Sequence, residues 1–132
     1  MAVSTIKERI RRDIHTVWEA VLAVDHYGAW RSDLKKAEVI NEKKFVEYAK
    51  NEYATTFTVT AIEPYKRWEF DMENSSMKGH WIGLFASKGN DTEIEFTEHV
   101  TPKKWFMKPF VKSYLKKQQA QFVLDLKKAL EK

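Results

Sequence analysis

The C-terminal stretch from Pro109 to Lys132 constrains the fold more than any other part of the chain. Its apolar residues recur at helical spacing: Phe110, Val111, Tyr114, Leu115, Phe122, Leu126, Ala129 and Leu130. Its opposite face carries lysines: Lys112, Lys116, Lys117, Lys127 and Lys128. A helix of about 23 residues spans ~34 Å, enough to cross a small domain. Because such an apolar stripe is too wide to leave in water, the preceding chain must provide a surface that receives it.

One polar residue interrupts this stripe. Gln118 lies four residues after Tyr114 and four before Phe122, where a plain core helix would carry leucine. The side chains of Gln118 and Tyr114 can both form hydrogen bonds from an otherwise apolar helix face. We interpret the pair as polar contacts for a ligand oxygen. The alternative is that Gln118 points to a loop or to the open end of a sheet.

The N-terminal part of the chain changes from a strand pattern to a helix pattern. In residues 3–11, Ile6 and Ile10 alternate with charged residues, which is typical of a half-buried strand. Asp13 is a suitable N-cap for the helix that follows. The apolar face of that helix consists of Ile14, Val17, Trp18, Val21 and Leu22. Residues 26–30 then predict a short second helical turn or a loop.

From about residue 35 the apolar period becomes two and stays so until the final helix. The alternation predicts six strands, at 37–40, 44–50, 53–63, 68–72, 77–87 and 94–100. Short turns separate them, including the strong hairpin signal Gly89-Asn90-Asp91. Consecutive strands joined by short turns pair antiparallel. The predicted fold is therefore α+β: a curved antiparallel sheet of six to seven strands wrapped around a long C-terminal helix, with one or two short helices after the first strand.

Size and composition place this fold in one domain. The 132 residues have a mass of 15.6 kDa, and we expect a single ligand-binding domain over residues 1–132. The absence of cysteine excludes disulfides, thiol catalysis and cysteine-bound zinc. No apolar run approaches the ~20 residues of a membrane span. The N-terminus lacks the apolar segment of a signal peptide, so we expect a cytoplasmic protein.

The net charge of +4 raises the question of a nucleic-acid partner. Lysine is concentrated only after residue 102, and acidic residues are mixed with basic ones everywhere before that point. This distribution does not favour nucleic acid. Nothing in the sequence indicates the oligomeric state.

The order of elements and several of their residues resemble a known family. The matching pieces are the strand ending in Ile10, the helix with Val17, Trp18 and Val21, the aromatics Tyr27 and Trp30, the strand Gly79-His80-Trp81, the hairpin Gly89-Asn90-Asp91-Thr92 before Ile94, and the terminal helix. Together they resemble the SRPBCC or START-like superfamily with its helix-grip fold, in particular the polyketide cyclase/dehydrase and lipid-transport branch. The resemblance implies a deep cavity between sheet and C-terminal helix that binds hydrophobic small molecules. It implies no universal catalytic set, and fold alone does not settle function.

Aromatic residues are the candidates for lining such a cavity. The chain has eight Phe, five Trp and five Tyr, and large rigid rings line many ligand pockets. The ligand-binding candidates are Phe57, Trp68, Phe70, Trp81, Phe96, Tyr114 and Gln118. For any single ring the alternative is that it fills the core.

Two carboxylates are weak candidates for catalysis. Glu8 and Glu98 share the phase of the apolar residues on their strands, which would turn them inward. A carboxyl group in an apolar cavity has a raised pKa and can act as a general acid or base. The alternative places both at solvated strand ends.

The sequence contains none of the common catalytic or cofactor motifs, so we expect no cofactor and no metal. Glu93, Glu95 and His99 superficially suggest metal ligands, but their phase predicts an exposed outer face.

The segment 101–110 joins aromatic and basic residues. Trp105, Phe106 and Met107 are flanked by lysines, and Pro109 either starts the main helix or kinks it. One interpretation is a helical turn packed on the end of the sheet. The other is an entrance lip that makes transient contact with an anionic membrane, with aromatic rings at the interface and lysines at phosphates.

Three functions follow from these patterns. The first is binding or transport of a hydrophobic small molecule, lipid-like or polycyclic. The second is a cyclase/dehydratase-type enzyme that uses an inward Glu as acid/base. The third is a protein-interaction module of the chaperone-associated kind. Inward carboxylates would distinguish the second function from the first, and a filled interior would favour the third.

Overall fold

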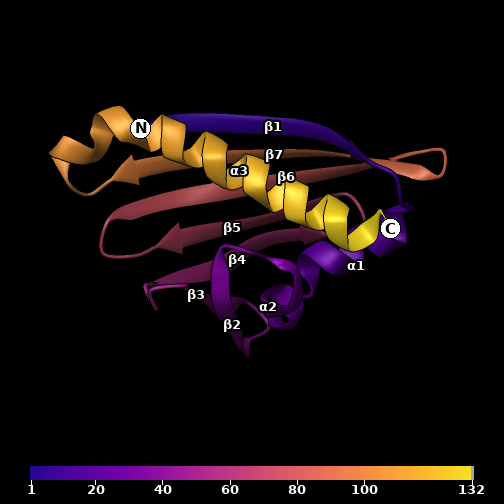
Figure 1. The fold of residues 1–132 in the computed structure, drawn as a ribbon, viewed down its shortest axis with the longest axis horizontal. Helices are drawn as coiled ribbons and strands as arrows, with labels where there is room; N and C mark the ends of the chain where they lie inside the picture. Colours follow the sequence, from indigo (N-terminus) through magenta and orange to yellow (C-terminus); the bar gives the residue numbers. More distant parts are fainter. Residues whose placement is uncertain (132) are drawn as a thin grey trace.

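In the computed structural model, which describes residues 1–131, a curved seven-stranded antiparallel sheet wraps one side of a long helix, α3 (Figure 1). The strand order across the sheet is β1-β7-β6-β5-β4-β3-β2. All adjacent strands are therefore consecutive in sequence, except the pair β1 and β7. The strands are β1 Ala2–Ile10, β2 Leu34–Asn41, β3 Lys44–Ala49, β4 Ala54–Glu63, β5 Arg67–Glu73, β6 Met77–Lys88 and β7 Asp91–Pro102. This is the helix-grip fold predicted from the sequence.

The helices follow β1 and β7. They are α1 Ile14–Leu22, α2 Tyr27–Trp30 and α3 Lys108–Leu130, with 3₁₀ turns at Val24–His26 and Trp105–Met107. Asp13 caps α1, because its carboxylate accepts hydrogen bonds from the Thr16 amide at 3.2 Å and the Thr16 hydroxyl at 2.6 Å. Pro109 lies in the first turn of α3, where its missing N–H costs nothing, so it starts the helix and does not kink it. The predicted end of this helix, Lys132, lies outside the described residues.

Helix α3 crosses the concave face of the sheet from the end of β7 to α1 (Figure 1). Its C-terminal half, through Val123 and Leu126, belongs to the main hydrophobic core under α1. Its N-terminal half packs Val111 and Leu115 on Val100 in a separate, smaller cluster. The helix is therefore held by two apolar contacts rather than by one continuous core.

A buried polar residue lies between these two clusters. Gln119 is only 4% exposed, and its side-chain oxygen accepts a hydrogen bond from the Ser4 hydroxyl at 2.8 Å. Its amide nitrogen donates to the backbone oxygens of Ser4 at 2.9 Å and Phe96 at 3.2 Å. Because a buried amide is costly without partners, this set of bonds fixes the height of α3 over β1 and β7.

Candidate ligand-binding cavity

A cavity of about 660 Å³ lies between the concave face of the sheet and the N-terminal half of α3. Its apolar lining comes from Leu34, Ala49, Phe57, Phe70, Met72, Met77, Trp81, Phe96, Pro102, Phe106, Met107, Phe110, Val111, Leu115 and Phe122. Its polar lining comes from Arg31, Asp33, Glu47, Tyr53, Thr55, Asn74, Ser76, Glu98, Tyr114, Gln118 and Gln119. The size and the mixture are typical of a small-molecule site.

Aromatic rings in mutual contact form the floor of the cavity. Phe70 and Trp81, paired across β5 and β6, stack with ring centroids 4.7 Å apart. Trp81 also contacts Phe96 at 4.8 Å, and Phe57 contacts Phe70 at 5.2 Å. Gly83 makes room for this arrangement, because a Cβ at Gly83 would overlap the Trp81 ring. The floor is rigid, since each ring is held by at least one other ring.

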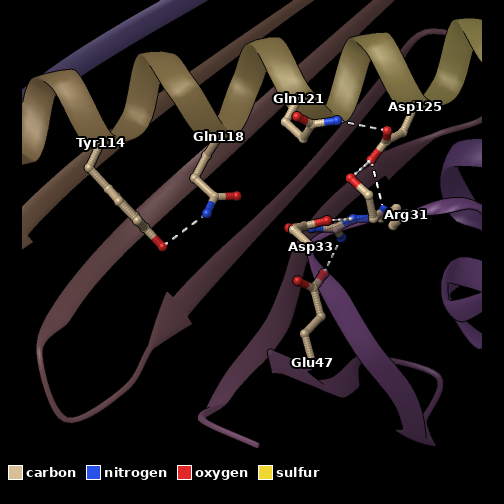
Figure 2. Close-up of polar contacts among 8 residues, drawn as sticks. Arg31, Asp33, Glu47, Tyr114, Gln118, Gln121 and Asp125 are labelled. Carbon is tan, nitrogen blue, oxygen red and sulfur yellow. Dashed lines mark hydrogen bonds and ion pairs between the residues drawn. The ribbon is translucent and has the colours of Figure 1, made fainter. Parts of the chain in front are cut away.

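One wall of the cavity carries an ion-pair network centred on Arg31, which follows α2. Its guanidinium binds Asp33 with two hydrogen bonds, Nε to Oδ1 at 3.1 Å and Nη2 to Oδ2 at 2.7 Å. Nη1 donates to Glu47 Oε2 on β3 at 2.9 Å (Figure 2). The guanidinium carbon also lies 5.0 Å from the ring centroids of both Tyr27 and Phe122. Burial acts to lower the pKa of Arg31, but Glu47 and Asp33 outweigh it and the pKa is raised, so Arg31 stays charged.

The segment that carries Arg31 is tied to α3. Asp125 Oδ2 accepts hydrogen bonds from the backbone amide and the hydroxyl of Ser32, both at 2.8 Å. Gln121 donates to Asp125 Oδ1 at 2.8 Å from one turn earlier on the helix (Figure 2). The Arg31 network is therefore anchored between β3 and the C-terminal half of α3.

Glu98 on β7 enters the cavity beside this network. It is paired across the sheet with Trp81 on β6 and Ser4 on β1. The Glu98 side chain is one of the residues that line the cavity. Burial raises the pKa of the Glu98 carboxyl to about 7, with a smaller contribution from the negative charge of Glu47 and opposition from Arg31. Near neutral pH this group can accept or release a proton, which is the property of a general acid or base.

Tyr114 and Gln118 project from α3 into the same space, as Figure 2 shows. The Gln118 amide donates to the Tyr114 hydroxyl at 3.2 Å. Burial raises the pKa of Tyr114. The interruption of the apolar stripe at Gln118 therefore marks a residue of the cavity wall, in the space between helix and sheet.

The cavity reaches the 3₁₀ turn and the first turn of α3. Phe106, Met107 and Phe110 line it there, while Trp105 does not. Trp105 and Phe110 are 79% and 70% exposed. The segment is a helical turn, as one of the two interpretations expected, but it does not bury its aromatic rings against the sheet.

Three of the sequence-predicted site residues lie outside this cavity: Trp105, Trp68 and Glu8. Trp68 is buried in the main core, where it packs between the rings of Phe45, Phe70 and Trp81. Glu8 lies under the last turns of α3, where Lys127 approaches its carboxylate to 3.1 Å. Phe57, Phe70, Trp81, Phe96, Tyr114, Gln118 and Glu98 do line the cavity, as do Phe106 and Met107 of the predicted lip.

The sequence reasoning missed the Arg31 network and Gln119. Glu47 follows Phe45 by two residues on β3, so the strand alternation does place it on the inner face. Arg31 gave no comparable signal, because it lies in a short connection without periodicity. Gln119 was hidden by its neighbour Gln118, since the two differ by about 100° around the helix.

Within residues 1–131 no helix is both long and apolar enough to cross a membrane. No cluster of three or more His, Asp or Glu side chains suited to a metal ion occurs in the same part of the chain, so Glu93, Glu95 and His99 do not form one.

Fold and cavity together define the class of helix-grip proteins with an internal site. The sequence matches the family described as polyketide cyclase / dehydrase and lipid transport over residues 1–131, and the chain belongs to this family. No curated protein matches it in sequence.

Solved structures share its fold at low sequence identity. A START superfamily protein from Mycobacterium smegmatis has a TM-score of 0.90 at 11% identity, covering 98% of this chain and 97% of that chain. The aromatase/cyclase Zhui from Streptomyces sp. R1128 has a TM-score of 0.85 at 9% identity, covering 98% and 93%. A conserved protein from Geobacillus kaustophilus has a TM-score of 0.84 at 12% identity, covering 98% and 95%.

Proposed function

We propose that the protein binds a hydrophobic small molecule, lipid-like or polycyclic, in the cavity between the sheet and α3. The observation that carries this proposal is the cavity itself, about 660 Å³ with an aromatic floor and a few polar groups on its walls. Ligand pockets of this kind typically measure ~300–1,000 Å³. The family, which includes lipid-transport proteins by its description, supports the same function.

Native mass spectrometry and a fluorescence assay would test this function. The protein should retain an apolar adduct on purification, or bind N-phenyl-1-naphthylamine with an increase in fluorescence. Ala49→Trp, which places a large ring in the cavity lining, should abolish the increase. Ala86→Trp adds the same ring at an exposed position of β6 and is the matched control. Absence of binding by the parent protein, or equal binding by the two variants, would contradict the proposal.

A second candidate function is a cyclase/dehydratase-type enzyme, and Glu98 is the observation that favours it. Its carboxyl faces the cavity and, because burial raises its pKa to about 7, it can exchange a proton near neutral pH. In a dehydration, the Glu98 carboxylate would take the proton from the carbon beside a ketone. The bond between the β-carbon and its hydroxyl would then break, and Glu98 would return that proton to the leaving hydroxyl as water. The aromatase/cyclase Zhui shares the fold.

An aryl β-hydroxy ketone tests this second function through the ultraviolet absorbance of the conjugated product. The parent protein should accelerate dehydration, and Glu98→Gln should remove the acceleration while N-phenyl-1-naphthylamine still binds. If the parent protein binds N-phenyl-1-naphthylamine but does not accelerate dehydration, the enzyme function is contradicted and only the binding function remains. The third alternative, a groove for a protein partner, depended on a filled interior and gains no support from a cavity of this volume.

We also propose transient contact between an anionic membrane and the lip formed by Trp105, Phe106 and Met107. The rings of Trp105 and Phe106 are exposed, and Lys103, Lys104 and Lys108 are exposed beside them. Aromatic side chains favour the membrane interface, and lysines near the surface are attracted to anionic lipids. Since Phe106 and Met107 also line the cavity, a ligand would enter from the side that faces the membrane.

A further inference from the structure

We propose that the cavity selects amphiphiles whose polar end is a protonated amine, and that the carboxylate of Glu98 receives this ammonium group. The inference rests on the proposed binding function and names the ligand class of the same site. It is carried by the distribution of charge on the cavity walls, by the lack of partners of Glu98 within residues 1–131, and by the rings around it.

Negative groups outnumber positive ones in the cavity. Among its lining residues, the side chains of Asp33, Glu47 and Glu98 are acidic, and Arg31 is the one basic side chain. Arg31 is already engaged, with two hydrogen bonds to Asp33 and one to Glu47. An anionic head group, such as that of a fatty acid, would meet excess negative charge and no free cation. The interior therefore has the opposite sign to the chain as a whole, whose net charge is +4.

Glu98 is the carboxylate available to a ligand. Within residues 1–131, no group hydrogen-bonds or ion-pairs with its side chain, whereas Asp33 and Glu47 are both held by Arg31. Because Glu98 is partly buried and faces the cavity, an ammonium donor from a ligand would give its carboxylate a charge-assisted hydrogen bond.

The surroundings of Glu98 also suit a cation. The rings of Trp81 and Phe96 flank it on the floor, and ring faces attract ammonium groups. On the α3 side of the same cavity, the Gln118 amide nitrogen donates to the Tyr114 hydroxyl, which leaves the Gln118 side-chain oxygen as an acceptor. A carboxylate, two aromatic rings and an amide oxygen form the kind of set that holds an ammonium head while the alkyl or ring portion lies along the apolar lining.

Competition among amphiphiles of equal chain length tests the proposal. Dodecylammonium, dodecyltrimethylammonium and dodecanoate, each below its micellar concentration, and dodecanol, below its solubility limit, would displace N-phenyl-1-naphthylamine at pH 7.5. Both cations should bind at least ~tenfold more tightly than dodecanoate, the difference expected for one favourable against one unfavourable buried charge contact. Equal or tighter binding of dodecanoate would overturn the inference.

The pH profile of the unmodified protein provides a second test. The titratable and charged groups that act on Glu98 are Glu47 from β3, Arg31 from the segment after α2, and Tyr114 from α3, and Asp33 lines the same cavity. Dodecyltrimethylammonium keeps its charge at every pH, so its affinity should rise from pH 5.5 to pH 8 as Glu98 loses its proton. The affinity of dodecanol should rise less over the same range. If the affinity for dodecyltrimethylammonium does not change over this pH range, Glu98 does not bind the cation.

A pair of variants on one strand separates the role of Glu98 from a general charge effect. Glu98→Gln should reduce the preference for the cation over dodecanol by ~tenfold, whereas Glu95→Gln, which alters the opposite face of β7, should leave it unchanged. Circular dichroism checks that both variants fold, and if Glu98→Gln does not, the pH profile decides. If neither dodecanol nor N-phenyl-1-naphthylamine binds, the proposed function fails. If dodecanol binds and the cations have no advantage, the ligand class alone is wrong.

Discussion

Gln119 and Ser4, 115 residues apart in sequence, exchange two hydrogen bonds that join α3 to β1. The Ser4 hydroxyl donates to the Gln119 side-chain oxygen, and the Gln119 amide donates to the Ser4 backbone oxygen. A third bond reaches the backbone oxygen of Phe96. This polar contact separates the packed part of the helix from the part that covers the cavity.

Replacing Gln119 should therefore destabilise the fold. Gln119→Leu removes the acceptor of the Ser4 hydroxyl and the amide bonds to two backbone oxygens, at an expected loss of about 1–3 kcal/mol in the free energy of unfolding. Gln118→Leu, one position away, should change stability by less than about 0.5 kcal/mol, because Gln118 faces the cavity. Urea denaturation of both variants measures the difference. Equal losses would mean that the Gln119 contacts do not matter for folding.

The Arg31 network should be sensitive to the loss of one partner. Arg31→Met leaves the carboxylates of Asp33 and Glu47 buried without a cation, which should cost ~3–5 kcal/mol of stability. Adding Glu47→Leu to this variant should recover part of the loss, since one of the uncompensated charges is removed. Thermal or urea unfolding of the single and double variants checks this coupling. Strictly additive losses would contradict it.

Glu98 should make stability depend on pH with a predictable sign. Its pKa is about 7 in the folded protein and 4.5 ordinarily, so the folded state holds the extra proton between these values. Stability from this group is therefore complete below pH 4.5 and is lost as the pH rises through 7. Glu98→Gln should become more stable than the parent as pH increases over this window, by up to ~3 kcal/mol.

Denaturation at pH 4.5 and pH 8 measures this effect, with Glu95→Gln as the control for removing a carboxylate from the same strand. If the difference between Glu98→Gln and the parent stays the same at both pH values, the carboxyl of Glu98 is not desolvated.

The membrane contact of the lip predicts a specific loss of vesicle binding. Trp105→Ala combined with Phe106→Ala should weaken binding to phosphatidylserine-containing vesicles by at least ~tenfold, because two large exposed rings no longer enter the interface. Higher salt should weaken the parent's binding as well, since lysine attraction is screened. Val39→Ala with Ile62→Ala removes exposed apolar side chains elsewhere and is the control. If both double variants are recovered equally with the vesicles on flotation, the lip does not contact the membrane.

Adding a Cβ at Gly83 should change the cavity floor, because the Trp81 ring occupies the space over this glycine. Gly83→Ala forces the Trp81 ring to move from its stack on Phe70, which should cost ~1–3 kcal/mol and alter the affinity for N-phenyl-1-naphthylamine. Gly28→Ala is the matched control, because its added Cβ would meet its nearest neighbour at an ordinary 3.7 Å. Unfolding and probe titration of both variants test the point. Unchanged values for Gly83→Ala would show that Trp81 is free to move.

The fold could be predicted because its signals are periodic. Alternation along β5 and β7 and the stripe on α3 each identify a buried face, and short turns then leave few ways to pair the strands. The inward position of Glu98 followed from the same alternation. Arg31 could not be found in this way, because its role depends on where α2 places it beside β3. The alternation correctly placed Trp68 on the inner face of β5, but it could not show that this ring lies in the filled core and not in the cavity wall.

The two apolar clusters along α3 divide the helix into two parts, of which the C-terminal one is held more firmly to the rest of the domain. Displacing its C-terminal half would break the packing of Val123 and Leu126 into the main core, together with the Asp125 contacts to Ser32. Displacing its first turns would break only the contacts of Val111 and Leu115 in the small cluster around Val100. The Gln119 bonds lie at the boundary between these parts. The free energy required to open the cavity on the α3 side is therefore a fraction of that required to unfold the domain, so the proposed ligand could exchange while the domain remains folded.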